Sequence, residues 1–363
     1  MRERPTAALT SVQPMASSEH CFIAADVGGT NARIGLVRAG LDDRVTVLAY
    51  RKYPCGEYPS LTAILAEFVA SNSACAGIDR MAIASAGVVL DDEVINSNLP
   101  WRISLPDMRR ELRLRDLQVI NDFEAAAHAA QCMSPDDSRL LTPGVTAAAQ
   151  GPVLVVGPGT GLGAAVRIPH SRGTVVLPTE AGLTAFAPGT DREIEILRWM
   201  QQRSRHVSTE QLVSGPGLVN LYEANCAIDG VTPDLRAPAA ISEAARRGDE
   251  AARDAVLTFC ALLGSVIGDL AVIASAKAVF VAGGILPQIA DFLPYSDFHA
   301  RLVDKGAMRA VLERVPVRLI ENERLGVIGA ASWYLQHLLD QDTPDQERAE
   351  HKSTAAQGHT GAA

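Results

Sequence analysis

Two segments of this chain share one pattern, in which an apolar run meets a glycine-rich turn and a second apolar run follows. The first segment is CFIAADVGGTNARIGLVRAG, residues 21–40, and the second is VLVVGPGTGLGAAVRI, residues 153–168. Apolar runs interrupted in this way predict β-hairpins. A Pro- and Gly-rich break at residues 141–152 separates them. Two similar hairpins, each heading one half of the chain, predict a duplicated α/β domain.

The remaining periodicity fits this plan, because short β-prone runs alternate with amphipathic segments. Further strands are expected at 45–53, 80–87, 117–122 and 278–285, and helices at 60–72, 105–112, from Phe123 onward, 192–204, 241–274 and 326–339. We expect the last helix to return to the first half. The predicted units are a small domain at 21–132 plus 325–340 and a large domain at 133–324. The polar ends, residues 1–20 and 341–363, are predicted to be disordered, and Met15 is an alternative start to Met1.

The totals exclude several classes of protein. A formal net charge of −9 argues against a nucleic acid or an anionic membrane as partner, because both need a basic surface. The six cysteines include no CxxC pair, so a zinc site is not expected. No side chain is predicted to bind a metal ion directly. We expect no apolar run to be long and clean enough to span a bilayer, and no secretory segment at the start of the sequence. These features predict a cytoplasmic protein.

The turn of the first hairpin carries polar side chains that suit a phosphate. Its two glycines are expected to turn with positive φ and let a ligand approach the backbone, and Asp26 could hold Mg²⁺ through water. An ordinary hairpin turn is the alternative interpretation for this motif taken alone. The candidate residues are Asp26, Gly28, Gly29, Thr30, Asn31 and Arg33.

The second hairpin turn contains four glycines, which a phosphate cradle needs more often than a structural turn does. It is not a P-loop, because no Gly-Lys-Ser/Thr follows, nor a Rossmann turn, because a strand follows instead of a helix. Two such hairpins could hold a triphosphate between them. The candidate residues are Gly157, Gly159, Thr160, Gly161 and Gly163.

Two more motifs lie at strand ends. Asp122, after a strand and before a helix, fits either a helix N-cap or a carboxylate that accepts a proton from an attacking hydroxyl, with Asn121 binding a neighbouring hydroxyl. Gly283 and Gly284 follow the run AVFV, where they fit either a simple turn or a surface for a flat adenine ring.

Taken in order, DVGGTNARIGLV, INDFEAAAHA, GPGTGLGAA, SGPGLVNLY and FVAGGI resemble the bacterial glucokinase family over residues 22–338. The resemblance implies an α/β, two-lobed actin-like ATPase fold of the ribonuclease H type, with a cleft between a smaller and a larger domain. It implies a kinase that uses ATP and Mg²⁺ to phosphorylate glucose at the 6-hydroxyl. Family members are often homodimers.

The resemblance also assigns a sugar site. Asn98, which is preferred to Asn96 because it lies nearer Trp101, and Asn121 would bind sugar hydroxyls, and Asp122 would be the catalytic base. Glu180 and Glu210 match the two carboxylates that bind the sugar in the family. Without the family, a solvated surface residue is the better interpretation of each Glu.

One departure from the family bears on the substrate. Where the family has Glu-Gly-Gly-His, this chain has Glu180-Ala181-Gly182-Leu183, and an Asp that follows in the family is replaced by Ala185. A lost hydrogen bond of this kind costs about 1–3 kcal/mol. The alternatives are therefore a kinase for another hexose or an amino sugar, and a sugar- or nucleotide-binding regulator with little turnover. A phosphoryl donor other than ATP is also left open.

Overall fold

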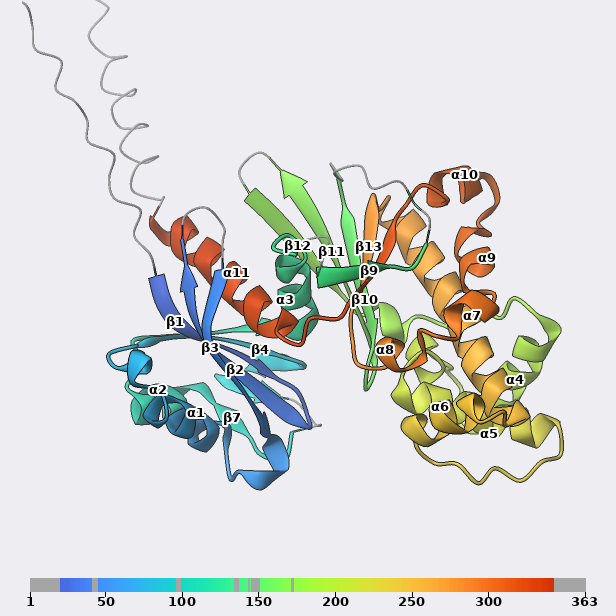
Figure 1. Ribbon diagram of the computed structural model, residues 1–363, viewed down its shortest axis with the longest axis horizontal. Helices are drawn as coiled ribbons and strands as arrows, with labels where there is room; N and C mark the ends of the chain where they lie inside the picture. Colours follow the sequence, from blue (N-terminus) through green and yellow to red (C-terminus); the bar gives the residue numbers. More distant parts are fainter. Residues whose placement is uncertain are drawn as a thin grey trace, which may run out of the picture.

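The computed structural model describes residues 20–40, 45–95, 99–133, 137–142, 144, 151–170 and 173–342. These residues form two large mixed β-sheets that lie in separate halves of the molecule, with helices on their faces (Figure 1). A third, three-stranded sheet extends the first half; its strands are β5 (Val88–Leu90), β6 (Glu93–Ile95) and β7 (Ile103–Ser104).

The first sheet is built around strand β1, which alternates its side chains between two cores. Ile23 and Ala25 face one core, whereas Phe22 and Ala24 face the other, as the two-residue period of a strand requires. Strand β1 is antiparallel to β2 and parallel to β4, which is in turn parallel to β8. In sheet order the strands are β3 (Val45–Pro54), β2 (Asn31–Ala39), β1 (His20–Val27), β4 (Arg80–Ser85) and β8 (Asp116–Asn121).

The second sheet repeats the order and directions of the first and adds one strand at the far edge. Strand β10 is antiparallel to β11 and parallel to β13, as β1 is to β2 and β4. The predicted duplication is therefore visible in the topology. In sheet order the strands are β12 (Gly173–Thr179), β11 (Leu162–His170), β10 (Val153–Pro158), β13 (Ala278–Val281), β14 (Val317–Ile320) and β9 (Ser138–Leu140).

Helices cover both faces of the first sheet. Helices α1 (Leu61–Ala70) and α2 (Leu105–Leu112) contribute to the core on one face. On the other face lie α3 (Asp122–Ala129) and α11 (Leu325–Asp342), so the last helix does return to the first sheet as predicted. The ring centroids of Phe22 and Tyr334 are 4.8 Å apart, which joins α11 to β1.

The second half carries most of the remaining helices, and one prediction about them is wrong. The single helix expected at 241–274 is two helices, because Gly248 has φ of +94° and the Asp249 side chain caps the second by accepting from the Ala252 N–H at 2.8 Å. The helices are α4 (Asp191–Gln201), α5 (Gly215–Ile228), α6 (Pro238–Arg246), α7 (Glu250–Ile273), α8 (Leu286–Ile289), α9 (Phe298–Val303) and α10 (Arg309–Leu312). Single turns of 3₁₀ helix are η1 (Cys55–Glu57), η2 (Ser73–Cys75), η4 (Ala181–Leu183), η5 (Thr209–Gln211), η6 (Leu293–Tyr295) and η7 (Gly306–Met308).

Helix α7 also corrects the expectation about membrane-spanning segments. By length and composition its 24 residues are apolar enough to cross a membrane. However, Phe259, Leu263 and Ile267 are fully buried in the core of the second half. The helix is therefore a core helix.

Helix α3 lies between the two sheets and belongs to both. Its Ala125 packs in the core shared with α11, whereas Ala126 and Ala127 pack with Val155 and Ala165 of the second sheet. The predicted domain boundaries, near 132 and 324, stay predictions. The predicted disordered ends lie outside the described residues, except for His20 in β1 and residues 341–342 in α11.

Candidate active site

The first hairpin motif and the Asn121-Asp122 motif both lie at the edge of the first sheet where its parallel strands end. Strands β1, β4 and β8 are parallel and end in register, with Val27 opposite Ser85 and Ser85 opposite Asn121. Side chains at the carboxyl ends of parallel strands gather at the same edge. The structure thereby brings Asp26 and Asp122, which are 96 positions apart in the sequence, within electrostatic range, since the negative charge of Asp26 raises the pKa of Asp122.

Asp26 is held by its hairpin partner. The Arg33 guanidinium donates to the Asp26 carboxylate at 3.1 Å, and the two residues are directly opposite in the β1–β2 ladder. Burial raises the pKa of Asp26, and the charge and hydrogen bond of Arg33 act in the opposite direction. Arg33 is thus engaged with Asp26.

The turn of this hairpin is tight but not left-handed. The Gly28 N–H donates to the Asn31 carbonyl at 3.0 Å. Neither Gly28 nor Gly29 is among the glycines with positive φ, so the prediction that both turn with positive φ is wrong. Thr30 at the tip of the turn is exposed.

Asn121, and not Asp122, fills the helix-cap role that the sequence offered for Asp122. The Asn121 side-chain oxygen accepts from the N–H groups of Phe123 at 2.9 Å and Glu124 at 3.2 Å, so Asn121 is the N-cap of α3. Asp122 is the first residue of the helix, and its cap interpretation is wrong. Because capping occupies the Asn121 oxygen, its NH₂ group is left to contact a ligand.

The Asp122 carboxylate is poised to exchange a proton near neutral pH. Burial and the negative charge of Asp26 raise its pKa to about 6, with a smaller contribution from Glu180, while the Phe123 N–H lowers it. A carboxylate with this pKa is ionised at pH 7 and is a stronger base than an ordinary Asp.

The four glycines of the second hairpin turn have different surroundings. Gly157 and Gly163 lie under the Phe123 ring, which fills the space that a side chain would take. Gly161 faces the Glu210 carboxylate, where a Cβ would come within 2.6 Å of an oxygen. Apart from its chain neighbours, Gly159 has nothing within 4 Å of the position of a Cβ, so open space adjoins its Cα, while its N–H donates to the Gly161 carbonyl at 2.8 Å.

The two predicted sugar-binding carboxylates, Glu210 and Glu180, differ in their contact with this turn. One Glu210 oxygen accepts from the Leu162 N–H at 3.2 Å. Glu180 is exposed at the start of η4, and it lies close enough to affect the pKa of Asp122. The segments that carry them are joined, because the Thr209 N–H donates to the Thr184 carbonyl at 2.8 Å.

Leu183, which stands where the family has a histidine, is 53% exposed. Its carbonyl contacts the His206 ring nitrogen at 2.9 Å. Asn98 and Asn96, predicted to bind the sugar, lie outside the described residues.

The turn after β13 adjoins the second hairpin. Gly283 has φ of +95°, and a Cβ there would lie 2.5 Å from the Pro158 carbonyl, so only glycine fits. Gly284 has nothing within 4 Å. The Gly215 N–H at the start of α5 donates to the Gly159 carbonyl at 2.8 Å, a contact that the sequence analysis missed although SGPG marks a helix start.

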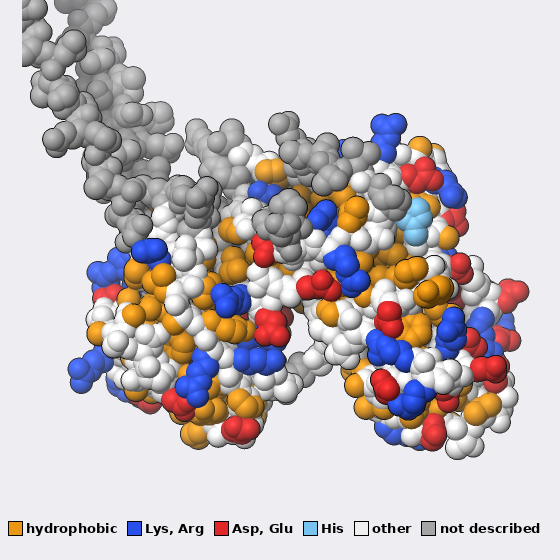
Figure 2. Space-filling model, in the orientation of Figure 1, with side chains coloured by type: hydrophobic (Ala, Val, Ile, Leu, Met, Phe, Trp, Pro, Cys, Tyr) orange, Lys and Arg blue, Asp and Glu red, His pale blue; other side chains and the backbone are white. Residues whose placement is uncertain are grey.

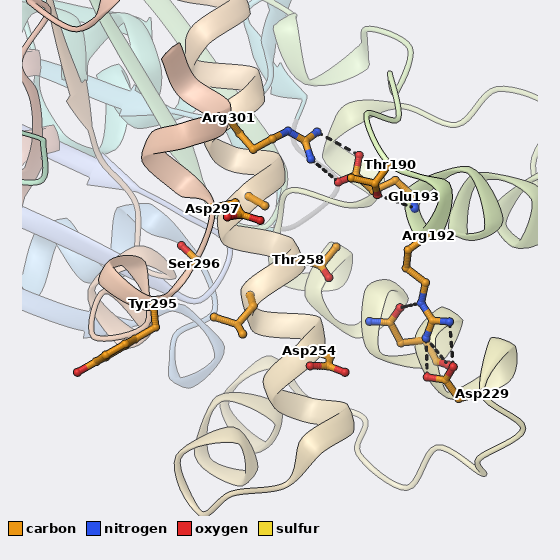
Figure 3. Close-up of a pocket in the computed structure, with 13 residues that line it drawn as sticks. Thr190, Arg192, Glu193, Asp229, Asp254, Thr258, Tyr295, Ser296, Asp297 and Arg301 are labelled. Atoms are coloured by element: carbon orange, nitrogen blue, oxygen red, sulfur yellow. Dashed lines mark hydrogen bonds and ion pairs between the residues drawn. The ribbon is translucent and has the colours of Figure 1, made fainter. Parts of the chain in front are cut away.

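Figure 2 shows the molecule hollowed between its two halves, with positive and negative side chains interleaved on the face in view. A different hollow, of about 450 Å³, lies among α4, α5, α7 and η6 (Figure 3). Its arginines are engaged, Arg192 with Asp229 and Arg301 with the buried Glu193. It contains none of the residues that the sequence singled out. Within the described ranges, no three His, Cys, Asp or Glu side chains cluster as metal ligands would.

Comparisons of this chain with protein families, with single proteins and with solved structures all gave matches. A family model described as glucokinase matches residues 23–337. A glucokinase-like protein from Xylella fastidiosa (strain Temecula1) is 44% identical over 319 residues, covering 86% of this chain and 94% of that protein. A glucokinase from Nitrobacter hamburgensis is 36% identical over 313 residues, covering 86% and 96%. The crystal structure of a glucokinase from an Antarctic psychrotroph matches with a TM-score of 0.76 and 32% identity, covering 86% and 98%.

Proposed function

The chain belongs to the glucokinase family, and from this premise we propose that it transfers the γ-phosphoryl group of ATP to the 6-hydroxyl of D-glucose. The observation that carries the proposal is Asp122. Its carboxylate lies at the start of a helix shared by both sheets and within electrostatic range of Asp26, with a pKa of about 6. That is the chemistry of a general base that accepts a proton as the hydroxyl attacks phosphorus in line.

The nucleotide would bind along the turn of the second hairpin, which adjoins the turn after β13 and the start of α5. Gly159 and Gly284 have open space at the position of a Cβ, and Gly283 brings the turn after β13 against Pro158. These features fit a phosphate chain and an adenosine that lie against backbone. Asp26 is the residue that would hold Mg²⁺ through water. Mg²⁺ bound with ATP would neutralise charge on the transferred phosphoryl group.

The sugar would contact Glu180, Glu210, the Asn121 NH₂ group and Asn98. Only one Glu210 oxygen accepts from Leu162, so the other is available to a sugar hydroxyl. Glu180 is exposed and near Asp122, where it would fix the orientation of the ring. These contacts would exclude water once the sugar is bound.

Leu183 favours one alternative, a kinase for another hexose or an amino sugar. An exposed apolar side chain cannot donate the hydrogen bond that an imidazole would, so discrimination among sugars would differ from that of family members with histidine. A regulator with little turnover is less consistent with the raised pKa of Asp122, which binding alone does not need. A cytoplasmic, homodimeric enzyme is part of the proposal, and light scattering on the purified protein tests the dimer.

The test is ADP release with Mg²⁺·ATP and glucose, mannose, fructose, glucosamine or no sugar. Turnover with glucose that falls at least about 10³-fold in Asp122→Ala supports the proposal. The control is Glu124→Gln, an acid in the same first turn of α3, which should keep activity within about threefold. Turnover with another sugar alone would move the substrate assignment. A wild type that binds sugar and ATP but turns over neither would favour the regulator.

A further inference from the structure

Phe123 directly follows the proposed base, and its ring rests on the second hairpin. A Cβ built at Gly157 would lie 3.0 Å from the Phe123 Cε1 atom, and one built at Gly163 would fall inside the ring's contact distance. Gly157 and Gly163 face each other in the β10–β11 ladder. The half-buried ring therefore covers a flat pair of glycines at the end of that hairpin.

The ring, and not the backbone dihedral, explains the glycine at position 163. Gly163 is not among the residues with positive φ, so an alanine there would meet no backbone strain. The three nearest atoms to its Cβ position all belong to Phe123. Gly157 is constrained further by the Ala282 carbonyl, 2.7 Å from its Cβ position.

Asp122 is consequently tied to both halves by its immediate neighbours. On one side Asn121 ends strand β8 of the first sheet and caps α3. On the other side Phe123 contacts the hairpin whose turn holds Gly159. Helix α3 as a whole packs on both sheets, so its first turn cannot shift without moving the ring over the glycines.

We propose that Phe123 is a positioning residue whose ring, seated on Gly157 and Gly163, sets the placement of the Asp122 carboxylate relative to the Gly159 turn. This inference rests on the proposed kinase function. A misplacement of about 1 Å in such a site can cost about 100-fold in rate. A substrate that binds to one half alone would keep almost the same affinity without the ring.

The first experiment compares Phe123→Ala and Phe123→Leu with Phe280→Ala. Phe280 is a matched control, because it is another partly buried phenylalanine packed against the same apolar cluster, and it comes from β13. We expect Phe123→Ala to lower kcat at least about tenfold with both KM values within about threefold, and Phe123→Leu to recover part of the loss. Phe280→Ala should lower thermal stability comparably and keep kcat within about threefold. Equal losses of kcat in the two alanine variants would overturn the proposal.

The pH profile gives a second readout that packing alone would not move. The charges that act on Asp122 are those of Asp26 and Glu180, and Arg33 is paired with Asp26. Water admitted by Phe123→Ala would reduce the desolvation of the Asp122 carboxylate. The acid limb of kcat/KM should therefore move to lower pH in Phe123→Ala and stay in place in Phe280→Ala. An unmoved limb in Phe123→Ala would count against the ring as a neighbour of the carboxylate.

A double-mutant cycle on thermal stability tests the contact between Phe123 and Gly163 without measuring activity. Gly163→Ala should lower the Tm of the wild type by clashing with the ring, and should lower it much less in the Phe123→Ala background, where the space is free. Additive effects would refute the contact. An active wild type with unchanged kcat in Phe123→Ala overturns this inference alone, whereas an inactive wild type overturns the proposed function and the positioning role with it.

Discussion

Replacing the proposed base by its neutral isostere, Asp122→Asn, should make the protein more stable while abolishing turnover. The carboxylate has a pKa of about 6 in the folded protein against an ordinary value of 3.8. One pKa unit corresponds to about 1.4 kcal/mol, so ionised Asp122 costs the fold on the order of 3 kcal/mol at neutral pH. Asparagine keeps the oxygen that accepts from the Phe123 N–H at 3.0 Å and removes the charge.

The sign and the pH window follow from the same shift. Because the folded-state pKa lies above the unfolded one, the folded protein binds the proton more tightly, and stability falls as pH rises through the interval from about 4 to about 6. The gain in Asp122→Asn should therefore be largest at pH 7.5, about half as large at pH 5 and smaller still at pH 4. A gain that does not depend on pH would refute this electrostatic origin.

The assay is thermal or urea unfolding of wild type and variant at several pH values. A control of opposite sign is Asp229→Asn, because the hydrogen bond from Arg192 lowers the pKa of Asp229 and its loss should destabilise the protein slightly. Asp122→Asn that is equally or less stable than wild type at pH 7.5 would show that the carboxylate is not desolvated as described. Gained stability with lost activity is the usual mark of a strained functional group.

Three further predictions concern His128, the pH profile of catalysis and Leu183. Burial, with a smaller effect of Arg167, lowers the pKa of His128 to about 4, so the contribution of His128 to stability should fall by roughly 2 kcal/mol between pH 7 and pH 5, against the opposite change from Asp122. The difference in unfolding free energy between wild type and His128→Leu should therefore change by that amount over this interval. The kcat/KM for the sugar should fall with unit slope below about pH 6 as Asp122 becomes protonated, and a profile flat to pH 5 would exclude it as the base. Leu183→His should lower the KM for glucose by roughly ten- to a hundredfold if glucose is the substrate, and a substrate panel that shows no change would mean that this position does not face the sugar.

The part of the fold that repeats in the sequence was predictable. Two apolar–glycine–apolar segments predicted two hairpins, and the sheets around β1 and β10 have the same order. The periodicity of α7 predicted a helix, but it could not locate the break at Gly248, because only the dihedral of that residue and the cap at Asp249 separate α6 from α7.

The site was predictable as a set of motifs and not as a set of contacts. The sequence placed Asn121 and Asp122 between a strand and a helix, but either residue could have been the cap, and only the hydrogen bonds of Asn121 decide it. The roles of the second hairpin's glycines depend on Phe123 and Glu210, which lie 34 or more positions away in the sequence, Gly157 being nearest to Phe123. Local sequence pattern carries no information about such long-range packing.

The return of α11 to the first sheet has a consequence for the chain as it is synthesised. The surface that includes Phe22 is buried only when Tyr334 arrives, so it stays uncovered while nearly the whole chain of 363 residues is translated. At about 5–20 residues per second, that wait is roughly 20–70 s. A nascent chain that stops before residue 325 would leave this surface open to proteases and to aggregation on the ribosome. The first half can therefore be completed only after translation has passed helix α11.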